Sequence, residues 1–227
     1  MKIIALDSST EACSVALLND GELTSQHEVA PRKHAELLLP FIDGLLTESG
    51  LTISQIDAIA FGRGPGAFTG IRIATGVVQG VAYASDLPVI PVSTLATMAQ
   101  GAWREQGETK VIAAIDARMN EVYWGAYELD GQQLMQQTVG ECVVKPEASP
   151  EIEGHDWHGC GSGWETYQDT LSSRYHLQLK NIEGARLPNA IDVATLAVAR
   201  FQAGDVVEAA HAMPVYLRDN VAEKKKR

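Results

Sequence analysis

The feature that most constrains this chain is that its opening pattern of strands and turns occurs twice. Residues 3–7, 13–18 and 23–29 predict three short strands, with the Asn19-Asp20-Gly21 turn joining the last two. The same order returns in residues 111–116, 122–127 and 134–139, with an Asp130-Gly131 turn. Aspartate ends the first strand of both copies, as Asp7 and Asp116, about 109 residues apart. A long internal repeat of this kind predicts a duplicated structural unit.

The segments that follow each meander predict alternating helices and strands. In the first copy the helices are expected near residues 33–49, 69–85 and 95–104, and the strands at 56–61 and 89–92. The second copy is less regular, with a short segment at 156–158 and helices near 165–173 and 190–202. This order is that of the actin-like, RNase H-like fold, an α/β fold of two lobes, each with a mixed sheet and helices. An unrelated α/β domain with two similar hairpins is the alternative.

The expected lobes are residues 1–105, carrying the partner helices described below, and residues 106–227, whose C-terminal segment can pack back on the first lobe. The 227 residues, 45% of them apolar, suffice for a substantial core. A net charge of −11 argues against a free-standing nucleic-acid binder, so any contact with RNA should be local or made within a complex. No apolar run is long enough for a signal peptide or a membrane span, and the three cysteines have no CxxC spacing, so a reducing cytoplasm is expected.

Asp7 and Asp116 are the candidate carboxylates of a cleft between the lobes, where related enzymes hold a metal-nucleotide. Aspartate at a strand end is also a common turn former. The glycine-rich loop of residues 62–70 follows a strand and opens a helix, which suggests phosphate binding. It lacks the GxxxxGK[ST] pattern, no acidic residue ends the next strand, and Pro65 removes one backbone donor. The cleft is therefore expected to be vestigial.

Histidine and cysteine residues give weak metal signals. His34 has Leu38 four positions later, so an HExxH pair is missing. His155 and His158 lie near Cys160 in a glycine-rich turn with no fourth ligand in sight. No serine lies in a GxSxG context, so nucleophilic catalysis has no support. We expect neither a metal site nor a catalytic set.

Two helices of the first copy carry more apolar surface than one core face requires. The first spreads its apolar residues over an arc of about 200°, roughly twice the stripe that one buried face needs. The second has small residues spaced four apart, which permit close approach of another helix. Packing on each other and on the sheet is the simpler explanation, but we expect a partner surface made of Leu37, Leu38, Phe41, Leu45, Ile73, Gly76, Val77, Gly80 and Ala84.

Four blocks in order carry a family resemblance: IIALDSSTEACSVAL at residues 3–17, FGRGPGAFTGIRIATGVVQGVA at 61–82, AAIDARMNEVYWG at 113–125 and PVYLRDNVA at 214–222. Together they resemble the TsaB family, also called YeaZ, over nearly the whole chain. The resemblance implies a bacterial, cytoplasmic, actin-like partner of the paralogue TsaD. With TsaE, TsaD transfers a threonylcarbamoyl group to the adenosine beside the anticodon of certain tRNAs, and TsaC makes the adenylate donor.

The resemblance also implies that the catalytic ligands are missing. Thr94 and Met98 stand where TsaD has its HxxxH metal site, and residues 116–119 replace its Ser-Gly-Gly-His loop. The expected role is a non-catalytic scaffold or activator of TsaD, which pairs with TsaD or with itself through its first two helices. The chain alone should bind no cofactor, any nucleotide should sit at a composite interface, and tRNA should be bound only within the complex.

Two alternatives remain open at this stage. The chain could be an enzyme of the actin-like superfamily, either an ATP-dependent phosphotransferase or a metalloprotease. The basic run of residues 224–227 could contact RNA, although most such tails are solvated.

Overall fold

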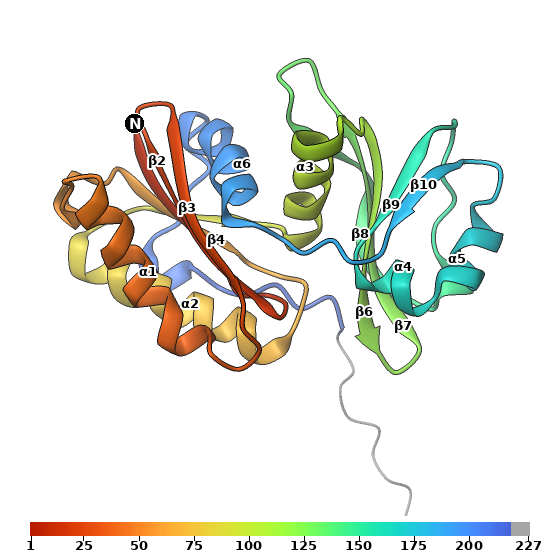
Figure 1. Cartoon of the computed structure of the whole chain (residues 1–227), viewed down its shortest axis with the longest axis horizontal. Coiled ribbons are helices and arrows are strands. Elements are labelled where there is room, and N and C mark those ends of the chain that lie inside the picture. Colours follow the sequence, from red (N-terminus) through yellow and green to blue (C-terminus); the bar gives the residue numbers. More distant parts are fainter. Residues whose placement is uncertain (219–227) are drawn as a thin grey trace, which may run out of the picture.

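The computed structural model describes residues 1–218 and consists of two lobes, each built on a five-stranded sheet (Figure 1). The first sheet has the order β3-β2-β1-β4-β5 and the second the order β10-β9-β6-β7-β8. The first five strands span Lys2–Asp7, Ala12–Asn19, Glu22–Val29, Ala58–Gly62 and Val89–Val92. The second five span Lys110–Arg118, Glu121–Leu129, Met135–Val144, Trp157–Cys160 and Leu179–Glu183.

The two sheets share one topology. In each, the first three strands form an antiparallel meander, and the next strand pairs in parallel with the first strand of the meander. The last strand again pairs in parallel with its neighbour. The predicted duplication and the α/β, actin-like fold class are therefore confirmed.

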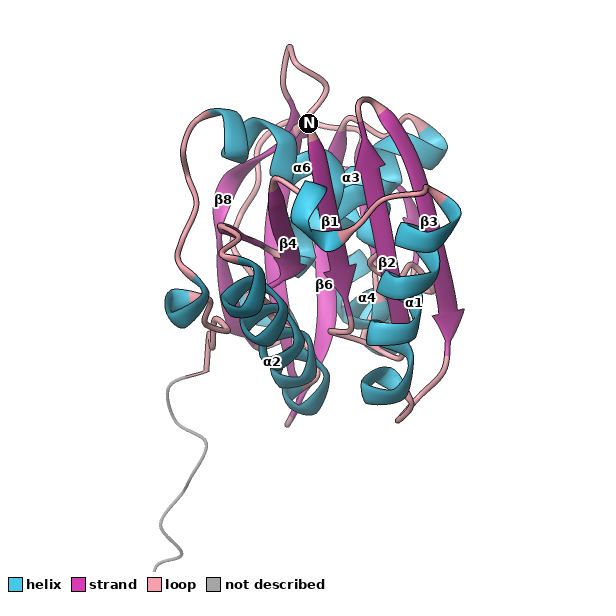
Figure 2. Ribbon diagram, turned by 90° about the vertical axis from the view of Figure 1, so that its left-hand side faces the viewer, coloured by secondary structure: helices cyan, strands magenta, loops and turns pink. Residues whose placement is uncertain are grey.

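Helices cover both faces of each sheet. They are α1 to α6, spanning His34–Glu48, Phe68–Ser85, Thr94–Gln106, Ser162–Thr166, Gln168–Arg174 and Ala190–Gln202. Helices α1 and α2 lie on one face of the first sheet and α6 on the other (Figure 2). In the second lobe α4 and α5 lie on one face, over a core rich in aromatic residues, and α3 lies on the other. Three short 3-10 turns complete the described structure, at Ile53–Gln55, Pro146–Ala148 and Ala209–His211.

Each half of the chain contributes one helix to the lobe that is built mainly from the other half. Helix α3 precedes the second sheet in sequence but packs on it, with Leu95 and Met98 in the same core as Val111. Helix α6 follows the second sheet but packs on the first, with Val193 and Ala197 in the core of that lobe. A boundary after residue 105 thus divides the two copies of the repeat along the chain, whereas each packed lobe contains one helix from the other copy.

The exchanged helices meet where the lobes join. The Arg104 guanidinium of α3 donates to both carboxylate oxygens of Asp192 on α6, at 2.8 and 2.9 Å. Asp192 is buried, which raises its pKa, and the hydrogen bonds from Arg104 oppose that rise. This bidentate ion pair links one lobe to the other.

Strand β10 and the break between α4 and α5 were not predicted. Strand β10 is an edge strand with mostly polar, partly exposed residues, so it lacks the apolar alternation that indicates a strand. The helix expected at 165–173 is divided at Tyr167. Within residues 1–218, no helix is long and apolar enough to cross a membrane.

Candidate functional site

Asp7, at the end of β1, is buried rather than open to the cleft. Only 1% of this residue is exposed to solvent. Its Oδ1 accepts hydrogen bonds from the Ser9 backbone N–H at 2.8 Å and from Ser9 Oγ at 2.7 Å, while its Oδ2 has no partner among the described residues. Burial raises the pKa of Asp7 to about 6, although the bonds from Ser9 act in the opposite direction. The carboxylate is therefore closed off from any ligand in the cleft.

The glycine-rich loop packs on the turn that follows Asp7. A Cβ on Gly62 would lie 1.8 Å from Asp7 Oδ2, and a Cβ on Gly70 would lie 1.9 Å from the Ser8 carbonyl oxygen. The Ala67 N–H donates to the Ser9 carbonyl at 2.7 Å. Gly66 and Gly70 thus allow the backbone of residues 8–9 to approach the loop and the start of α2 closely, and Gly62 leaves room for the Asp7 carboxylate. Residues 7–9 of the chain itself therefore fill the space beside these three glycines.

Asp116, at the corresponding place in the second lobe, is partly buried and has 11% of its side chain exposed at the cleft between the lobes. Its carboxylate accepts from Arg118 Nη1 at 2.9 Å and from Tyr167 Oη at 3.3 Å, and its own N–H donates to Ser162 Oγ at 3.1 Å. It lines a cleft of about 1140 Å³ between the lobes, to which Ser9, Phe68 and Arg118 also contribute but Asp7 does not. The expectation that the two carboxylates face each other across this cleft is not met, because the Ser8–Ser9 turn covers Asp7.

Thr94 and Met98, which the resemblance places at the TsaD metal site, are both buried. Thr94 is 0% and Met98 1% exposed, and Met98 packs with residues of β6 and β9. A Cβ on Gly161 would lie 2.2 Å from Met98 Cε, so this thioether fills the space beside the second glycine-rich loop. Met98 thus forms part of the packing between α3 and the second sheet, while Thr94 is the first residue of α3.

The histidines considered as metal ligands have other partners. His34 bonds the Thr10 carbonyl through Nε2 at 2.8 Å, and His158 Nδ1 lies 2.6 Å from Asn181 Oδ1. His155 is exposed and bonds the Leu177 carbonyl, while Cys160 is buried with its pKa raised to about 12 by desolvation. Across residues 1–218, no three His, Cys, Asp or Glu side chains are grouped so that they could hold a metal ion.

The predicted partner face divides into buried and accessible parts. Leu38 and Leu45 are 0% and 2% exposed in the core under α1, so including them was wrong. The sheet takes half of the apolar arc of α1, and the other half remains at the surface. Leu37, Phe41, Ile73 and Val77 are half-buried, and Gly76, Gly80 and Ala84 are exposed.

Helix α2 presents open space along this face. A Cβ built on Gly76 or Gly80 would meet no atom within 4 Å. Leu39 is 52% and Tyr83 84% exposed on the same two helices. We call the accessible residues Leu37, Phe41, Ile73, Gly76, Val77, Gly80 and Ala84 the α1–α2 face.

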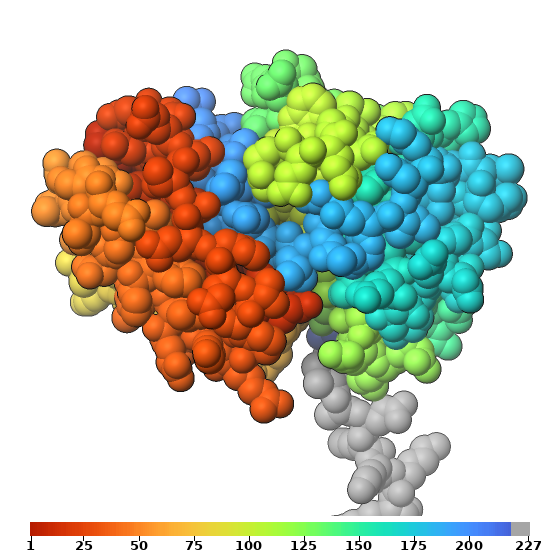
Figure 3. All heavy atoms as spheres, in the orientation of Figure 1, coloured from red at the N-terminus to blue at the C-terminus, as the bar shows by residue number. Residues whose placement is uncertain are grey.

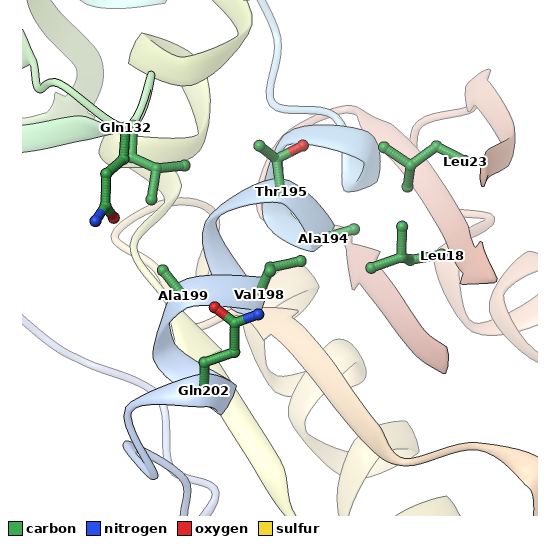
Figure 4. A pocket seen from close by; sticks show the side chains of 9 residues that line it. Leu18, Leu23, Gln132, Ala194, Thr195, Val198, Ala199 and Gln202 are labelled. Atoms are coloured by element: carbon green, nitrogen blue, oxygen red, sulfur yellow. The ribbon is translucent and has the colours of Figure 1, made fainter. Parts of the chain in front are cut away.

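A second groove, which the sequence did not suggest, lies beside α6. It has a volume of about 340 Å³ and is lined by Leu18, Leu23, Leu134 and the α6 residues Ala194 and Val198 (Figure 4). Its wall combines the tip of the first hairpin, α6 and the β7–β8 turn, three segments far apart in sequence. Only the exchange of α6 to the first lobe brings them together, so no local pattern could have indicated it.

The fold and these sites define a class: two-lobed, duplicated proteins of actin-like architecture. A family model described as "TsaD: tRNA N6-adenosine threonylcarbamoyltransferase" matches residues 22–226. The chain is 48% identical to the Escherichia coli K12 "tRNA threonylcarbamoyladenosine biosynthesis protein TsaB", covering 99% of this chain and 98% of that protein. The Haemophilus influenzae protein of the same name is 42% identical, over 99% and 97% of the two chains.

Solved structures with a similar fold lead to the same family. "YeaZ from Pseudomonas aeruginosa" superposes with a TM-score of 0.89 at 51% identity, covering 95% of this chain and 99% of that one. A second Pseudomonas aeruginosa structure, described as having "similarity to peptidase YEAZ", gives a TM-score of 0.90 at 50% identity, with 96% and 99% coverage. The chain belongs to the TsaB (YeaZ) family.

Proposed function

We propose that this chain is a non-catalytic subunit that binds a TsaD-type threonylcarbamoyltransferase through its α1–α2 face and supports modification of tRNA. The observation that carries the proposal is the α1–α2 face itself: exposed small residues beside half-buried apolar ones, on the lobe whose carboxylate is sealed. The names of the E. coli and H. influenzae relatives support the pathway.

The closed state of Asp7 supports a role other than catalysis. A carboxylate that holds a metal-nucleotide must be accessible, whereas Asp7 is covered by the Ser8–Ser9 turn. Thr94 and Met98, where the resemblance places a metal site, are core residues. These contacts support the proposal that the chain acts through its partner's active site.

The α1–α2 face supports both heterodimer and homodimer formation. Gly76 and Gly80 lie four residues apart with open space above them, so the backbone of a partner helix can approach α2 closely. Phe41 and Val77 supply apolar area beside that track. A TsaD-type paralogue, which shares the fold, can offer a matching pair of helices, as can a second copy of this chain. TsaE and TsaC would then act on the pair, in the cytoplasm, and any nucleotide would bind at a composite interface.

Charge substitutions on α2 test the pairing. Val77→Asp and Gly76→Glu place a carboxylate where the partner helix should pack, so we expect complete loss of co-elution with the TsaD partner in size-exclusion chromatography. Lys145→Glu, at an exposed lysine of the other lobe, is the matched control and should leave co-elution unchanged. Circular dichroism should show that all three variants are folded. Intact pairing of both α2 variants would contradict the proposal.

An activity assay and a binding measurement test whether the chain itself is catalytic. A threonylcarbamoylation assay with the TsaD partner should lose its product when this chain is omitted or carries Val77→Asp. Titration calorimetry of the isolated chain with Mg-ATP, together with metal analysis, should show no tight binding. Tight binding of either would favour the alternative of an ATP-dependent or metal-dependent enzyme.

A further inference from the structure

The cleft between the lobes has a positively charged mouth on a negatively charged protein. Its lining includes four arginines, Arg32, Arg72, Arg118 and Arg218, against two acidic residues, Glu11 and Asp116. The chain as a whole has a net charge of −11. Arginine is therefore concentrated at this opening, although the protein as a whole is acidic.

Arg72 is held in place while part of its guanidinium stays available. Its Nε donates to Tyr216 Oη at 2.8 Å, and its Cζ lies 3.7 Å from the centre of the Phe68 ring and 5.7 Å from that of Tyr216. No carboxylate pairs with it, and its two Nη groups have no acceptor within residues 1–218. The two rings orient a guanidinium whose outer edge can bind a phosphate bidentately.

Arg32 is a second arginine without a counter-ion. It is exposed at the same opening, and the described part of the chain gives its side chain no hydrogen-bond or ion-pair partner. Arg118 and Arg218 differ, because Arg118 pairs with Asp116 and Arg218 pairs with Glu121. Within residues 1–218, two of the four arginines thus form no ion pair with a carboxylate.

Exposed flat and apolar side chains accompany these arginines. Phe68 is 56%, Tyr216 45% and Met119 70% exposed. They come from three segments: the start of α2, the chain after α6, and the β6–β7 turn. Residues 214–218 run between the lobes, with the Val215 N–H donating to the Arg63 carbonyl and Arg218 bonding the Arg118 carbonyl (Figure 1). Arginine beside exposed rings is the combination that binds phosphates and stacks bases in single-stranded nucleic acids.

We propose that the mouth of the interlobe cleft, centred on Arg72 and Arg32, is a contact site for the phosphate backbone of the tRNA anticodon arm within the assembled complex. This inference rests on the proposed function, because the chain alone carries too much negative charge to bind RNA well. It assigns the RNA contact to the cleft mouth. The basic run of residues 224–227 lies outside the described residues and is not part of the proposed site.

The test uses the full chain paired with its TsaD partner. Binding of a labelled anticodon stem-loop RNA is measured by fluorescence anisotropy over a series of salt concentrations, for the wild type, Arg32→Gln, Arg72→Gln and the double variant. Each lost charge-assisted contact should weaken binding by about tenfold. Each should also reduce the slope of log K against log[salt] by about 1. Lys2→Gln removes one positive charge at the start of β1, at the opposite end of that strand from Asp7 and outside the cleft lining, and should change neither quantity.

The outcomes separate this inference from the proposed function. Size-exclusion chromatography should show that all variants still pair with the TsaD partner, because Arg32 precedes α1 and the Arg72 guanidinium is held at the cleft by Phe68 and Tyr216. Normal pairing with unchanged RNA affinity and salt slope would overturn the inference and leave the proposed function intact. The inference is also overturned if AMP or ATP binds this site with the same sensitivity to both substitutions while the RNA does not. Loss of pairing by the wild type itself would instead refute the proposed function.

Discussion

The two lobes begin with the same three strands and end the first strand with the same residue, yet Asp7 is sealed and Asp116 is open. In the first lobe the Ser8–Ser9 turn folds over the carboxylate and is itself covered by the glycine-rich loop. In the second lobe the chain continues into Ala117 and Arg118, and Asp116 bonds the exposed Arg118 at the cleft. The same repeated strand thus carries a buried aspartate in the first lobe and an aspartate at the cleft in the second.

The glycines explain how this difference arises. In both lobes a glycine-rich loop lies on the end of the first strand: Gly62 meets Asp7, while Gly161 and Gly163 meet Ala114. In the first lobe the following helix also meets the turn, through Gly70 and the Ser8 carbonyl. In the second lobe Ser162 only accepts from the Asp116 N–H. The first copy therefore buries its aspartate under the turn, whereas the second places its aspartate at the cleft between the lobes. Figure 3 shows the two lobes with the segment coloured blue between them.

The largest expected effect comes from breaking the seal over Asp7. Gly70→Ala places a Cβ 1.9 Å from the Ser8 carbonyl oxygen, a backbone atom that cannot move without displacing the turn. We expect a loss of about 3 kcal/mol or more in the free energy of unfolding, measured by urea denaturation. Gly76→Ala, in open space on the same helix, should instead be neutral or gain up to about 1 kcal/mol. Equal stability of the two variants would show that the turn is not tightly packed.

The second effect concerns the pH dependence that the sealed carboxylate of Asp7 should have. The pKa of Asp7 rises from 3.8 to about 6 on folding, so its contribution to stability is present below pH 3.8 and is lost as the pH rises through 6. That loss is on the order of 3 kcal/mol. Asp7→Asn removes the titration, so the variant should gain stability relative to the wild type between pH 4 and pH 7. A difference between them that does not change with pH would contradict the burial of an ionisable group.

The third prediction asks whether the two lobes unfold as one unit. Asp192→Ala removes the buried partner of Arg104, which is itself about one-third exposed. We expect a loss of about 2 kcal/mol, reduced from the value for a fully buried pair by solvent screening of Arg104. Calorimetry should then show broadening or separation of the unfolding transitions of the lobes. Asp205→Ala, which breaks an exposed pair with Arg200, is the control and should cost about 0.5 kcal/mol or less.

The smallest effect is expected at the open end. Asp116→Asn weakens a contact with Arg118, whose side chain is 86% exposed, so the free energy of unfolding should change by less than about 0.5 kcal/mol. The same denaturation series checks this value against that of Asp7→Asn. A loss comparable to that of the Gly70 variant would mean that both strand ends are structurally sealed.

The sequence by itself determined the duplicated topology. Alternating apolar residues, the two Asp-Gly turns and the repeated aspartate are local signals, and each reports the strand or turn in which it stands. The wide apolar arc of α1 and the small residues of α2 likewise indicated a surface beyond the core. The local pattern could not tell which half of that arc the sheet would cover, so Leu38 and Leu45 were misplaced on the partner face.

Only the tertiary structure decided which lobe each helix joins and which aspartate stays accessible. The position of α6 depends on its apolar face, where Val193 and Ala197 share a core with Ile90 and with strands still earlier in the chain. The arginines of the cleft mouth come from separate elements and converge only in the folded chain. Burial and charge convergence are properties of contacts between distant segments, and periodicity along the chain carries no information about them.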